Sequence, residues 1–424
     1  MMSIDRTTPP EWGDIKMPVI PTFEKTRLQN GLLMYTMKGG EQPVVKIDLV
    51  VQAGKLRCEK GMVASATLNL LNEGTTSMSS KEFAEKLEFY GAYMWGGATQ
   101  RAANVSMICM QKDLRNVLDL VADAILHPQY PEMELEIYKQ QKLQNLVINK
   151  MKTSYVATTE MSKAVYKEGL FTRTATEESI KALESGALHA FHDEAYRSTD
   201  AHLMVFGLPS DDDISYISET FGKQLVEGEK WQHPMPEYAE RSDRRVDMES
   251  EQTSIVVARP LFGKQHPDYM KMSVLDTILG GYIGSRLMQN LREKLGLTYG
   301  ITSHISSNSA YGTHIIRSDI KKGEHERALD EIRKEMKRLS EEIVTENELE
   351  NVRNYMLGEV LRSFESPIAS SDTILELLVD DIDSNTYTKR CYDSIKDTTP
   401  EDLQALAKKW LNPDEYSTIV VGKL

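Results

Sequence analysis

The sequence predicts an α+β protein made of two homologous domains, each an antiparallel-rich sheet with helices on one face. The first observation is an internal repeat, because Glu-Ser-Ile-Lys at 178–181 recurs as Asp-Ser-Ile-Lys at 393–396. Each copy continues without a gap through an amphipathic helix, a polar turn and an apolar strand. These strands end at Gly207 and Gly422, which are 215 residues apart (422 − 207). A match through helix, turn and strand indicates a duplicated unit.

The first parts of the two units also correspond. The apolar stretch 44–51 predicts a strand, and 254–258 is its counterpart. Each is followed by two helical segments, a turn at Gly91 or Gly296, a strand and an amphipathic helix. We therefore assign 1–223 to the N-terminal domain, 224–251 to a linker and 252–424 to the C-terminal domain. The linker assignment depends on the polar, Pro-containing composition of that segment.

Length and charge restrict the classes of function. A chain of 424 residues is longer than one hydrophobic core normally supports. The net charge of −14 and the pI near 5.3 argue against nucleic acid or anionic membrane as a partner. Three scattered cysteines do not form a disulfide framework. No signal peptide is recognisable, so the expected location is cytoplasmic, or periplasmic if a signal has been removed.

The second half contains the most distinctive motif, between residues 275 and 299. It reads Leu-Gly-Gly at 279–281, then Ser-Arg-Leu at 285–287, Arg292-Glu and Gly-Leu-Thr-Tyr299. This pattern closely resembles the C-terminal domain of the inverzincin peptidases, the M16 family of pitrilysin and mitochondrial processing peptidase. The resemblance covers nearly the whole chain and implies a LuxS/MPP-like metallohydrolase fold. It also implies that Arg292 and Tyr299 bind the substrate carbonyl beside a zinc ion of another half or subunit, a role that suits their hydrogen-bond donors.

The first half departs from the family at its metal site. Family members carry H-x-x-E-H on a helix that is soon followed by Gly-Thr. Aligned on Gly74-Thr75, the two ligand positions hold Ser65 and Asn69, and the general-base position holds Leu68. A later helix places Asn145 where the third ligand, a Glu, is expected. Zinc prefers imidazole, thiolate or carboxylate, so we expect no zinc and no catalytic residue in this chain.

A paired histidine on one helix is the rival metal candidate. His189 and His192 share a face at i, i+3, yet the second copy of the repeat has Gln404 and Ala407 there. We therefore interpret this face as solvated.

The resemblance implies a non-catalytic subunit of a heterodimeric zinc endopeptidase. Its partner would be a homologous H-x-x-E-H subunit that holds the zinc, and its substrate a peptide. The strand that contains Tyr93, Met94 and Trp95 would border the peptide chamber, although a core strand is an equally good interpretation. The alternative function is a non-enzymatic structural or peptide-binding homologue, as a homodimer or within a larger assembly.

Overall fold

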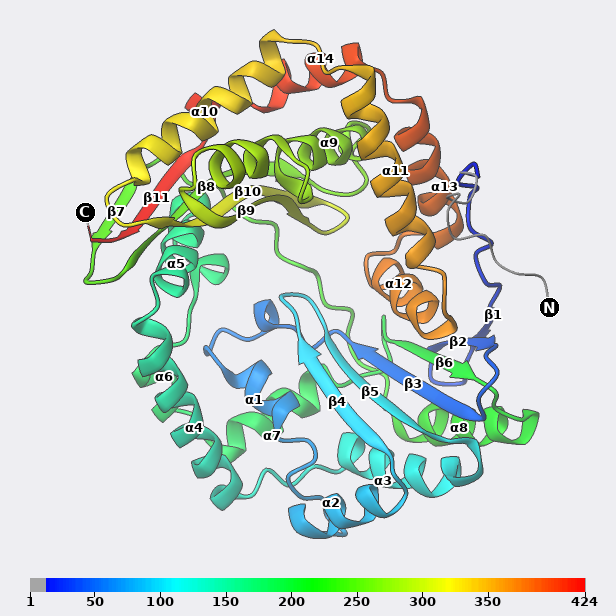
Figure 1. The fold of residues 1–424 in the computed structure, drawn as a ribbon. Helices are drawn as coiled ribbons and strands as arrows, with labels where there is room; N and C mark the ends of the chain where they lie inside the picture. Colours follow the sequence, from blue (N-terminus) through cyan, green and yellow to red (C-terminus); the bar gives the residue numbers. More distant parts are fainter. Residues whose placement is uncertain (1–12, 424) are drawn as a thin grey trace, which may run out of the picture.

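The computed structural model describes residues 13–423 and contains two β-sheets (Figure 1). The strands of the first sheet follow the order β1-β2-β6-β3-β5-β4. All neighbours in it are antiparallel except β2 and β6, which are parallel. The bounds are β1 Glu24–Arg27, β2 Leu33–Lys38, β3 Val44–Val51, β4 Tyr93–Ala98, β5 Ala103–Met110 and β6 His202–Gly207.

The second sheet repeats this arrangement. Its order is β7-β11-β8-β10-β9, and only the β7–β11 pair is parallel. In chain order the strands β2 to β6 therefore correspond to β7 to β11, and β1 is an addition to the first sheet. The bounds are β7 Arg244–Asp247, β8 Gln252–Phe262, β9 Thr298–Ser307, β10 Tyr311–Lys321 and β11 Ser417–Gly422. The predicted fold class is confirmed; β7 lies inside the segment predicted as a linker.

The repeat seen in the sequence recurs in the element boundaries. Helix α7 (Ser185–Ala195) and helix α14 (Pro400–Trp410) begin 215 residues apart (400 − 185), as do β6 and β11 (417 − 202). Thr399 and Asp402 form a capping box at the start of α14, so side chains satisfy backbone groups that the helix leaves open. The two copies thus end in the same helix-turn-strand unit.

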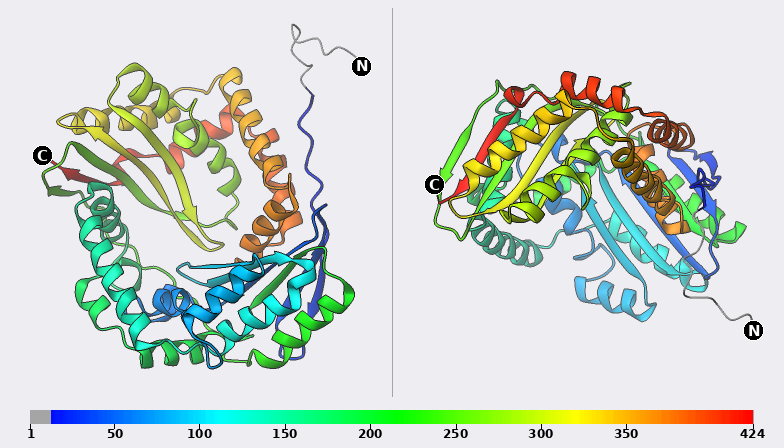
Figure 2. Two further views of the ribbon diagram at one scale, coloured as in Figure 1. Left: turned by 60° about the horizontal axis from the view of Figure 1, so that its bottom comes forward. Right: turned by 45° about the horizontal axis from the view of Figure 1, so that its top comes forward.

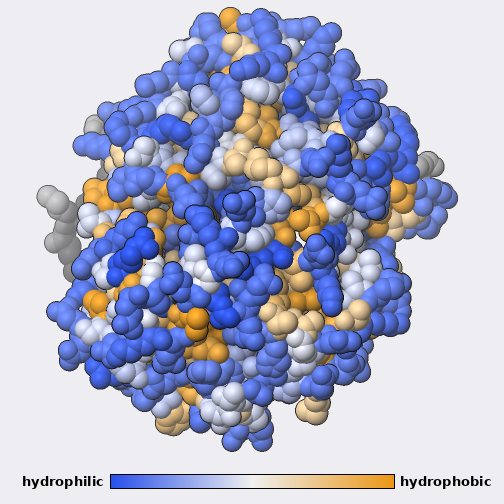
Figure 3. Space-filling view, turned by 180° about the vertical axis from the view of Figure 1, so that it is seen from behind, coloured by the Kyte–Doolittle hydropathy of each residue, from blue (hydrophilic) through white to orange (hydrophobic). Residues whose placement is uncertain are grey.

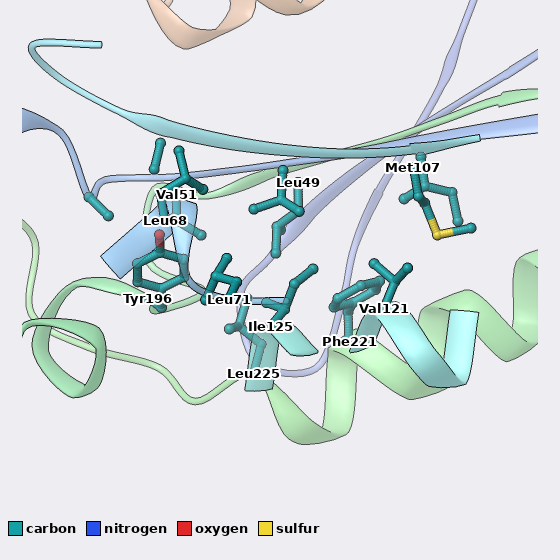
Figure 4. Packing of buried hydrophobic residues seen from close by; sticks show 14 of the residues in the cluster. Leu49, Val51, Leu68, Leu71, Met107, Val121, Ile125, Tyr196, Phe221 and Leu225 are labelled. Atoms are coloured by element: carbon teal, nitrogen blue, oxygen red, sulfur yellow. The ribbon is translucent and has the colours of Figure 1, made fainter. Parts of the chain in front are cut away.

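One face of each sheet carries the main core of its half. In the first half, α1, α3, α7 and α8 pack on alternate residues of the strands, among them Leu49, Val51 and Met107 (Figure 4). In the second half, α9, α10, α11 and α14 cover the corresponding face, together with two π-helical segments, η4 and η5. Bounds are α1 Val63–Asn69, α3 Leu114–Leu126, α8 Asp211–Gln224, α9 Tyr269–Asp276, η4 Thr277–Gly281, η5 Met288–Lys294, α10 His325–Glu341 and α11 Glu346–Arg362.

Each half also lends one helix to the other, which the sequence did not predict. Helix α5 (Thr153–Val165) packs against the second sheet, where Ala157 and Met161 join Val256 and Ile419 in one cluster. Helix α12 (Pro367–Val379) packs against the first sheet, joining the cluster that contains Tyr35, Met37 and Phe206. The prediction of helices on one face is therefore incomplete. The exchange bridges the two sheets on opposite sides of the molecule (Figure 1).

The remaining helices lie at the periphery (Figure 2). They are α2 (Ser80–Phe89), α4 (Glu132–Lys150), α6 (Glu177–Lys181), α13 (Ser384–Asp397) and the 3₁₀ turns η1 (Lys55–Arg57), η2 (Gln111–Asp113), η3 (Leu170–Thr172) and η6 (Pro413–Glu415). On the face behind Figure 1, hydrophilic residues cover most of the surface and hydrophobic residues show in separate patches (Figure 3). Across residues 13–423, none of the helices has the length and apolar character to traverse a bilayer.

Candidate functional site

Two helices of the first half bring the predicted ligand positions together. Asn69 ends α1, and Asn145 lies on α4. Both line a pocket of about 410 Å³ together with Tyr138 and Gln141. The Asn69 Nδ2 donates to the Ser65 carbonyl at 2.6 Å and lies 3.4 Å from the Tyr138 hydroxyl. Two of the three predicted ligand positions, Asn69 and Asn145, thus line one pocket, and Ser65 lies one turn before Asn69 on α1.

The side chains at this site do not fit a zinc ion. A hydroxyl and two amides stand at the three positions, and none supplies the imidazole, thiolate or carboxylate that zinc prefers. Within the described part of the chain, no three His, Cys, Asp or Glu side chains are grouped so that they could hold a metal. Burial raises the pKa of Tyr138 despite the opposing hydrogen bond from Asn69, so this hydroxyl stays neutral. The pocket thus combines neutral hydrogen-bonding groups with the charged side chains of Glu73, Glu134 and Lys142.

Leu68 occupies the base position and belongs to the hydrophobic core. It is 5% exposed and lies among Val51, Leu71 and Tyr196 (Figure 4). Helix α1 approaches β4 so closely that a Cβ at Gly96 would lie 3.1 Å from Leu68 Cδ1 and 2.6 Å from the carbonyl oxygen of Asn104. Packing against the sheet therefore replaces proton transfer as the role of this position.

Strand β4 is the outer strand of the first sheet and presents aromatic side chains. Tyr93 is 69% exposed and Trp95 is 47% exposed. Met94 points to the other face, where it packs against the cluster of Phe83 and Leu120. Trp95 and Met94 also line a pocket of about 160 Å³ beside Asn69. Of the three residues predicted to line the chamber, Tyr93 and Trp95 are thus on the accessible face.

The Arg-Tyr motif lies at the corresponding edge of the second sheet. Arg292 sits in the π-helical segment η5 with its side chain 39% exposed, and its Nε is 3.4 Å from the Glu293 carboxylate. Gly296, with φ of +61°, turns the chain into β9, where Tyr299 is 89% exposed. A π-helical turn is rare and often marks a functional position. Both donors are therefore available to a ligand that approaches β9.

Arg286 of the same motif has a structural contact that the sequence did not reveal. Its Nε and one terminal nitrogen donate to the Glu348 carboxylate at 2.8 and 2.9 Å. This two-bond pair joins the motif to α11. The motif thus combines an anchored arginine with an accessible one.

The rival histidine pair is occupied by backbone contacts. The His189 Nε2 lies 3.0 Å from the carbonyl oxygen of Gln129, and the His192 Nε2 lies 2.7 Å from that of Ile125. His192 is buried, and burial lowers its pKa although the carbonyl contact opposes the shift. The prediction of a solvated face is therefore wrong, because this face fastens α7 to the end of α3 and the loop after it.

A further cavity lies between the halves, and no sequence signal pointed to it. Its volume is about 500 Å³, and Arg101, Lys264, Tyr311 and Asp380 are among the lining residues. Arg101 donates to Asp380 at 2.8 Å, and Lys264 donates to Glu376 at 2.8 Å. Burial alone would lower the pKa of Lys264, but these acidic neighbours raise it, so the amine is charged. Segments far apart in the sequence, among them β3, β10 and α12, thus meet in this cavity.

Comparisons with known proteins agree with this architecture. Residues 182–356 match the model of the peptidase M16 inactive domain. The "uncharacterized zinc protease YmxG" of Bacillus subtilis is 25% identical over 302 residues, which cover 69% of this chain and 72% of that protein. The "non-peptidase homolog YmxG" of Helicobacter pylori is 24% identical over 350 residues, 76% of each chain.

Solved structures share the fold over nearly the whole chain. A peptidase M16 inactive domain from Pseudomonas fluorescens superposes with a TM-score of 0.88 at 24% identity, covering 95% of this chain and 98% of the other. A protease from Helicobacter pylori gives 0.85 at 15% identity, covering 95% and 100%. The chain is thus a duplicated α+β protein whose fold is that of a peptidase M16 inactive domain. The chain is therefore similar to proteins of the peptidase M16 family over most of its length, and residues 182–356 match the model of the inactive domain of that family.

Proposed function

We propose that this chain is the non-catalytic subunit of a heterodimeric M16-type zinc endopeptidase. A homologous subunit with H-x-x-E-H would hold the zinc. This chain would contribute Arg292, Tyr299 and half of a chamber for a peptide. The observation that carries the proposal is the contrast between the two sites of the chain. The metal-ligand positions have lost their chemistry, while the Arg-Tyr motif is intact and accessible at the edge of β9.

The chemistry of the two donors suits this role. When water attacks a peptide carbonyl, negative charge develops on its oxygen. The Arg292 guanidinium has a permanent charge and five N–H donors, and the Tyr299 hydroxyl adds one donor. Among the described residues, the one ion pair of the Arg292 side chain is with Glu293 at 3.4 Å, which is longer than a strong charge-assisted hydrogen bond. Its donors therefore remain available for the substrate.

The second candidate is a structural or peptide-binding homologue without a peptidase partner, as a homodimer or in an assembly. The relative from Helicobacter pylori that carries the name "non-peptidase homolog" favours it. The two candidates differ in what they require of Arg292 and Tyr299. A scaffold needs neither donor, whereas a peptidase subunit needs both. The net charge of −14 argues against nucleic acid or a membrane surface as partner under either candidate.

Reconstitution with an H-x-x-E-H homologue from the same genome tests the proposal. We expect Arg292→Ala or Tyr299→Phe to lower kcat for a quenched fluorescent peptide by roughly 10²–10³, as single oxyanion-donor deletions do. The zinc content of the partner and the assembly of the pair should not change. Arg333→Ala and Tyr355→Phe are matched controls on the outer helices α10 and α11, and they should keep the wild-type rate. Unchanged rates in the Arg292 and Tyr299 variants with stable assembly would favour the scaffold.

A further inference from the structure

Helix α4 presents an uncharged face to solvent at the outer edge of the molecule (Figure 1). Five apolar side chains on this face are between 43% and 71% exposed: Met133, Ile137, Val147, Ile148 and, at the C-cap, Met151. Three exposed glutamines, Gln140, Gln141 and Gln144, fill the remaining positions. The solvated side of a helix normally carries charged residues, and 27% of this chain is charged. An uncharged face of this length therefore indicates a surface that another protein covers.

Six residues of this face have the spacing of a coiled-coil seam, at successive intervals of 4, 3, 4, 3 and 4 residues. They are Met133, Ile137, Gln140, Gln144, Val147 and Met151. Their order reads alike in both directions, because methionine stands at each end, a β-branched residue comes next and glutamine lies in the middle. In an antiparallel pair of such helices, each layer of the seam therefore joins residues of the same kind.

Charged residues line the two edges of this face with the same symmetry. Glu132 and Lys150 are 18 residues apart (150 − 132), which is about five helical turns, so they lie on one edge. Glu134 and Lys152 have the same separation and lie on the other edge. A two-fold axis at the centre of an antiparallel pair exchanges the ends but keeps each edge on its own side, so glutamates of one helix lie beside lysines of the other. A parallel pair places glutamate beside glutamate, so the charges favour the antiparallel direction.

The centre of the face carries no charge that would repel a second copy. The midpoint of the repeat falls on Lys142, whose ammonium nitrogen lies 4.9 Å from the centroid of the Tyr138 ring, on the buried side of the helix. On the exposed side, Gln140 and Gln144 flank this midpoint. An amide side chain both donates and accepts, so two glutamines can form hydrogen bonds with each other across a two-fold axis.

We propose that α4 is the interface between two copies of this chain, packed antiparallel about a two-fold axis at the level of Lys142. Met133 contacts Met151 of the partner subunit, and Ile137 contacts Val147 of the partner subunit. Between them, Gln140 forms a hydrogen bond with Gln144 of the partner subunit. One self-complementary patch then serves both copies, as an isologous dimer requires. A partner of different sequence has no need of a face that reads alike in both directions.

The dimer also borders the pocket between α1 and α4. Ile137 belongs to the interface and lines that pocket of about 410 Å³, so the second copy lies at the rim of the pocket. The interface shares no residue with the Arg-Tyr motif at β9. The inference therefore does not depend on the proposed function, and it is compatible with it.

Sedimentation velocity of the isolated full chain, over a series of concentrations, tests the dimer. One helix pair buries less than the roughly 1,200 Å² of a standard interface, so we expect a Kd on the order of 10 µM. Val147→Glu should raise this Kd about a hundredfold, because it places a carboxylate in two apolar layers of the dimer. Phe89→Glu is the matched control, because Phe89 is 81% exposed at the end of α2, outside the interface, and it should keep the wild-type Kd. A wild-type chain that stays monomeric at a tenfold higher concentration, or equal Kd values for the two variants, would overturn the proposal.

Charge reversal tests the antiparallel direction. Glu132→Lys and Lys150→Glu should each weaken the dimer about tenfold at low salt, because each brings like charges together at both ends of the seam. The double variant exchanges the two charges and should return to the wild-type Kd. Asp212→Lys is the control for the loss of an acidic residue from the first turn of a helix, here α8, and it should leave the Kd unchanged. A double variant as weak as the single variants would mean that Glu132 and Lys150 do not meet, and the antiparallel arrangement would be wrong.

The other occupant of this face, the H-x-x-E-H homologue, gives a different result. A monomeric chain whose Val147→Glu variant no longer assembles with that homologue would assign the face to the homologue and overturn the proposal of a second copy. The proposed function would survive that result. Conversely, a dimer that depends on Val147 can form in a chain that never joins a peptidase, so the two proposals fail in different experiments.

Discussion

The two halves share one strand order but differ where a helix meets the outer strand of the sheet. In the first half, the regular helix α1 brings Leu68 into the core beside β4. In the second half, the π-helical segments η4 and η5 precede β9, and Arg292 remains accessible. The duplicated sheets thus preserve topology, while the helical segments before the outer strand differ in form between the two halves.

Their interiors differ as well. The core under α1 is formed by apolar side chains, whereas the second half buries His314 within its sheet. The His314 Nε2 lies 2.9 Å from Asp276, and its Nδ1 lies 2.6 Å from the Tyr416 hydroxyl. Ser303 completes the cluster through bonds to Asp276 and His314. A fully satisfied polar cluster can stand inside a core, so the fold does not require the two cores to be chemically alike.

The largest expected effect on stability comes from a substitution at Leu68, the residue at the general-base position of the first half. Leu68→Glu places a carboxylate among Val51, Leu71 and Tyr196, and we expect a loss of about 3 kcal/mol or more in the free energy of unfolding. Asn69→Glu is the control, because the neighbouring side chain is exposed, and it should cost less than about 1 kcal/mol. Urea denaturation measures both. Similar stabilities for the two variants would show that α1 can rotate its base position out of the core.

The next largest expected loss of stability comes from a substitution in α12, one of the two exchanged helices. Ile374→Ala empties part of the contact between α12 and the first sheet and should cost about 2–4 kcal/mol. Although Ile374 belongs to the second half in sequence, we expect faster amide hydrogen exchange in β6 of the first half. Ile332→Ala on α10 is the matched control and should affect β8 and β10 instead. If Ile374→Ala loosens only the second half, α12 does not support the first sheet.

Restoring the metal ligands is expected to change the stability somewhat less, through the binding of zinc. Ser65→His, Asn69→His and Asn145→Glu together place three zinc ligands around the pocket between α1 and α4. We expect one zinc per chain by elemental analysis, and a gain of about 2.7 kcal/mol at a free zinc concentration 100 times Kd. The change should not require Leu68→Glu, because the base is not a ligand. A triple variant that binds no zinc would show that α1 and α4 are too far apart for the ligand geometry.

Sequence patterns predicted the features that depend on local order. The strand ending at Gly207 has its counterpart at Gly422, and the glycines of the predicted turns, Gly91 and Gly296, both have positive φ. The exchange of α5 and α12 was missed because an amphipathic pattern shows that a helix packs but not against which sheet. The cavity was missed for the same reason, since Arg101 and Tyr311 meet only through the tertiary fold.

Acidification is expected to have the smallest effect on stability, and this effect is spread over several histidines. Burial lowers the pKa of His192 and of His202 in the first half and of His304 in the second, and it lowers the pKa of His233, in the segment between them, to about 4. The Ile125 carbonyl and then Asp193 oppose the shift at His192, and Asp381 and then Asp200 oppose it at His202. The folded state therefore binds protons less readily than the unfolded chain, whose imidazoles titrate near pH 6.5. This contribution to stability is complete above that pH and is lost as the pH falls through the lower folded values.

Besides His233, two histidines with a lowered pKa lie in the first half and one lies in the second, so we expect acid to loosen the first half more. We expect amide hydrogen exchange between pH 7.5 and 5, corrected for the intrinsic pH dependence of exchange, to rise more in β6 than in β11. Replacing both His192 and His202 with Gln should flatten the pH dependence in β6, because Gln does not titrate and can still donate to the Ile125 carbonyl. His304→Gln is the comparison and should flatten only the smaller change in the second half. An equal response of β6 and β11 in the wild type would mean that the exchanged helices couple the halves so strongly that they open together.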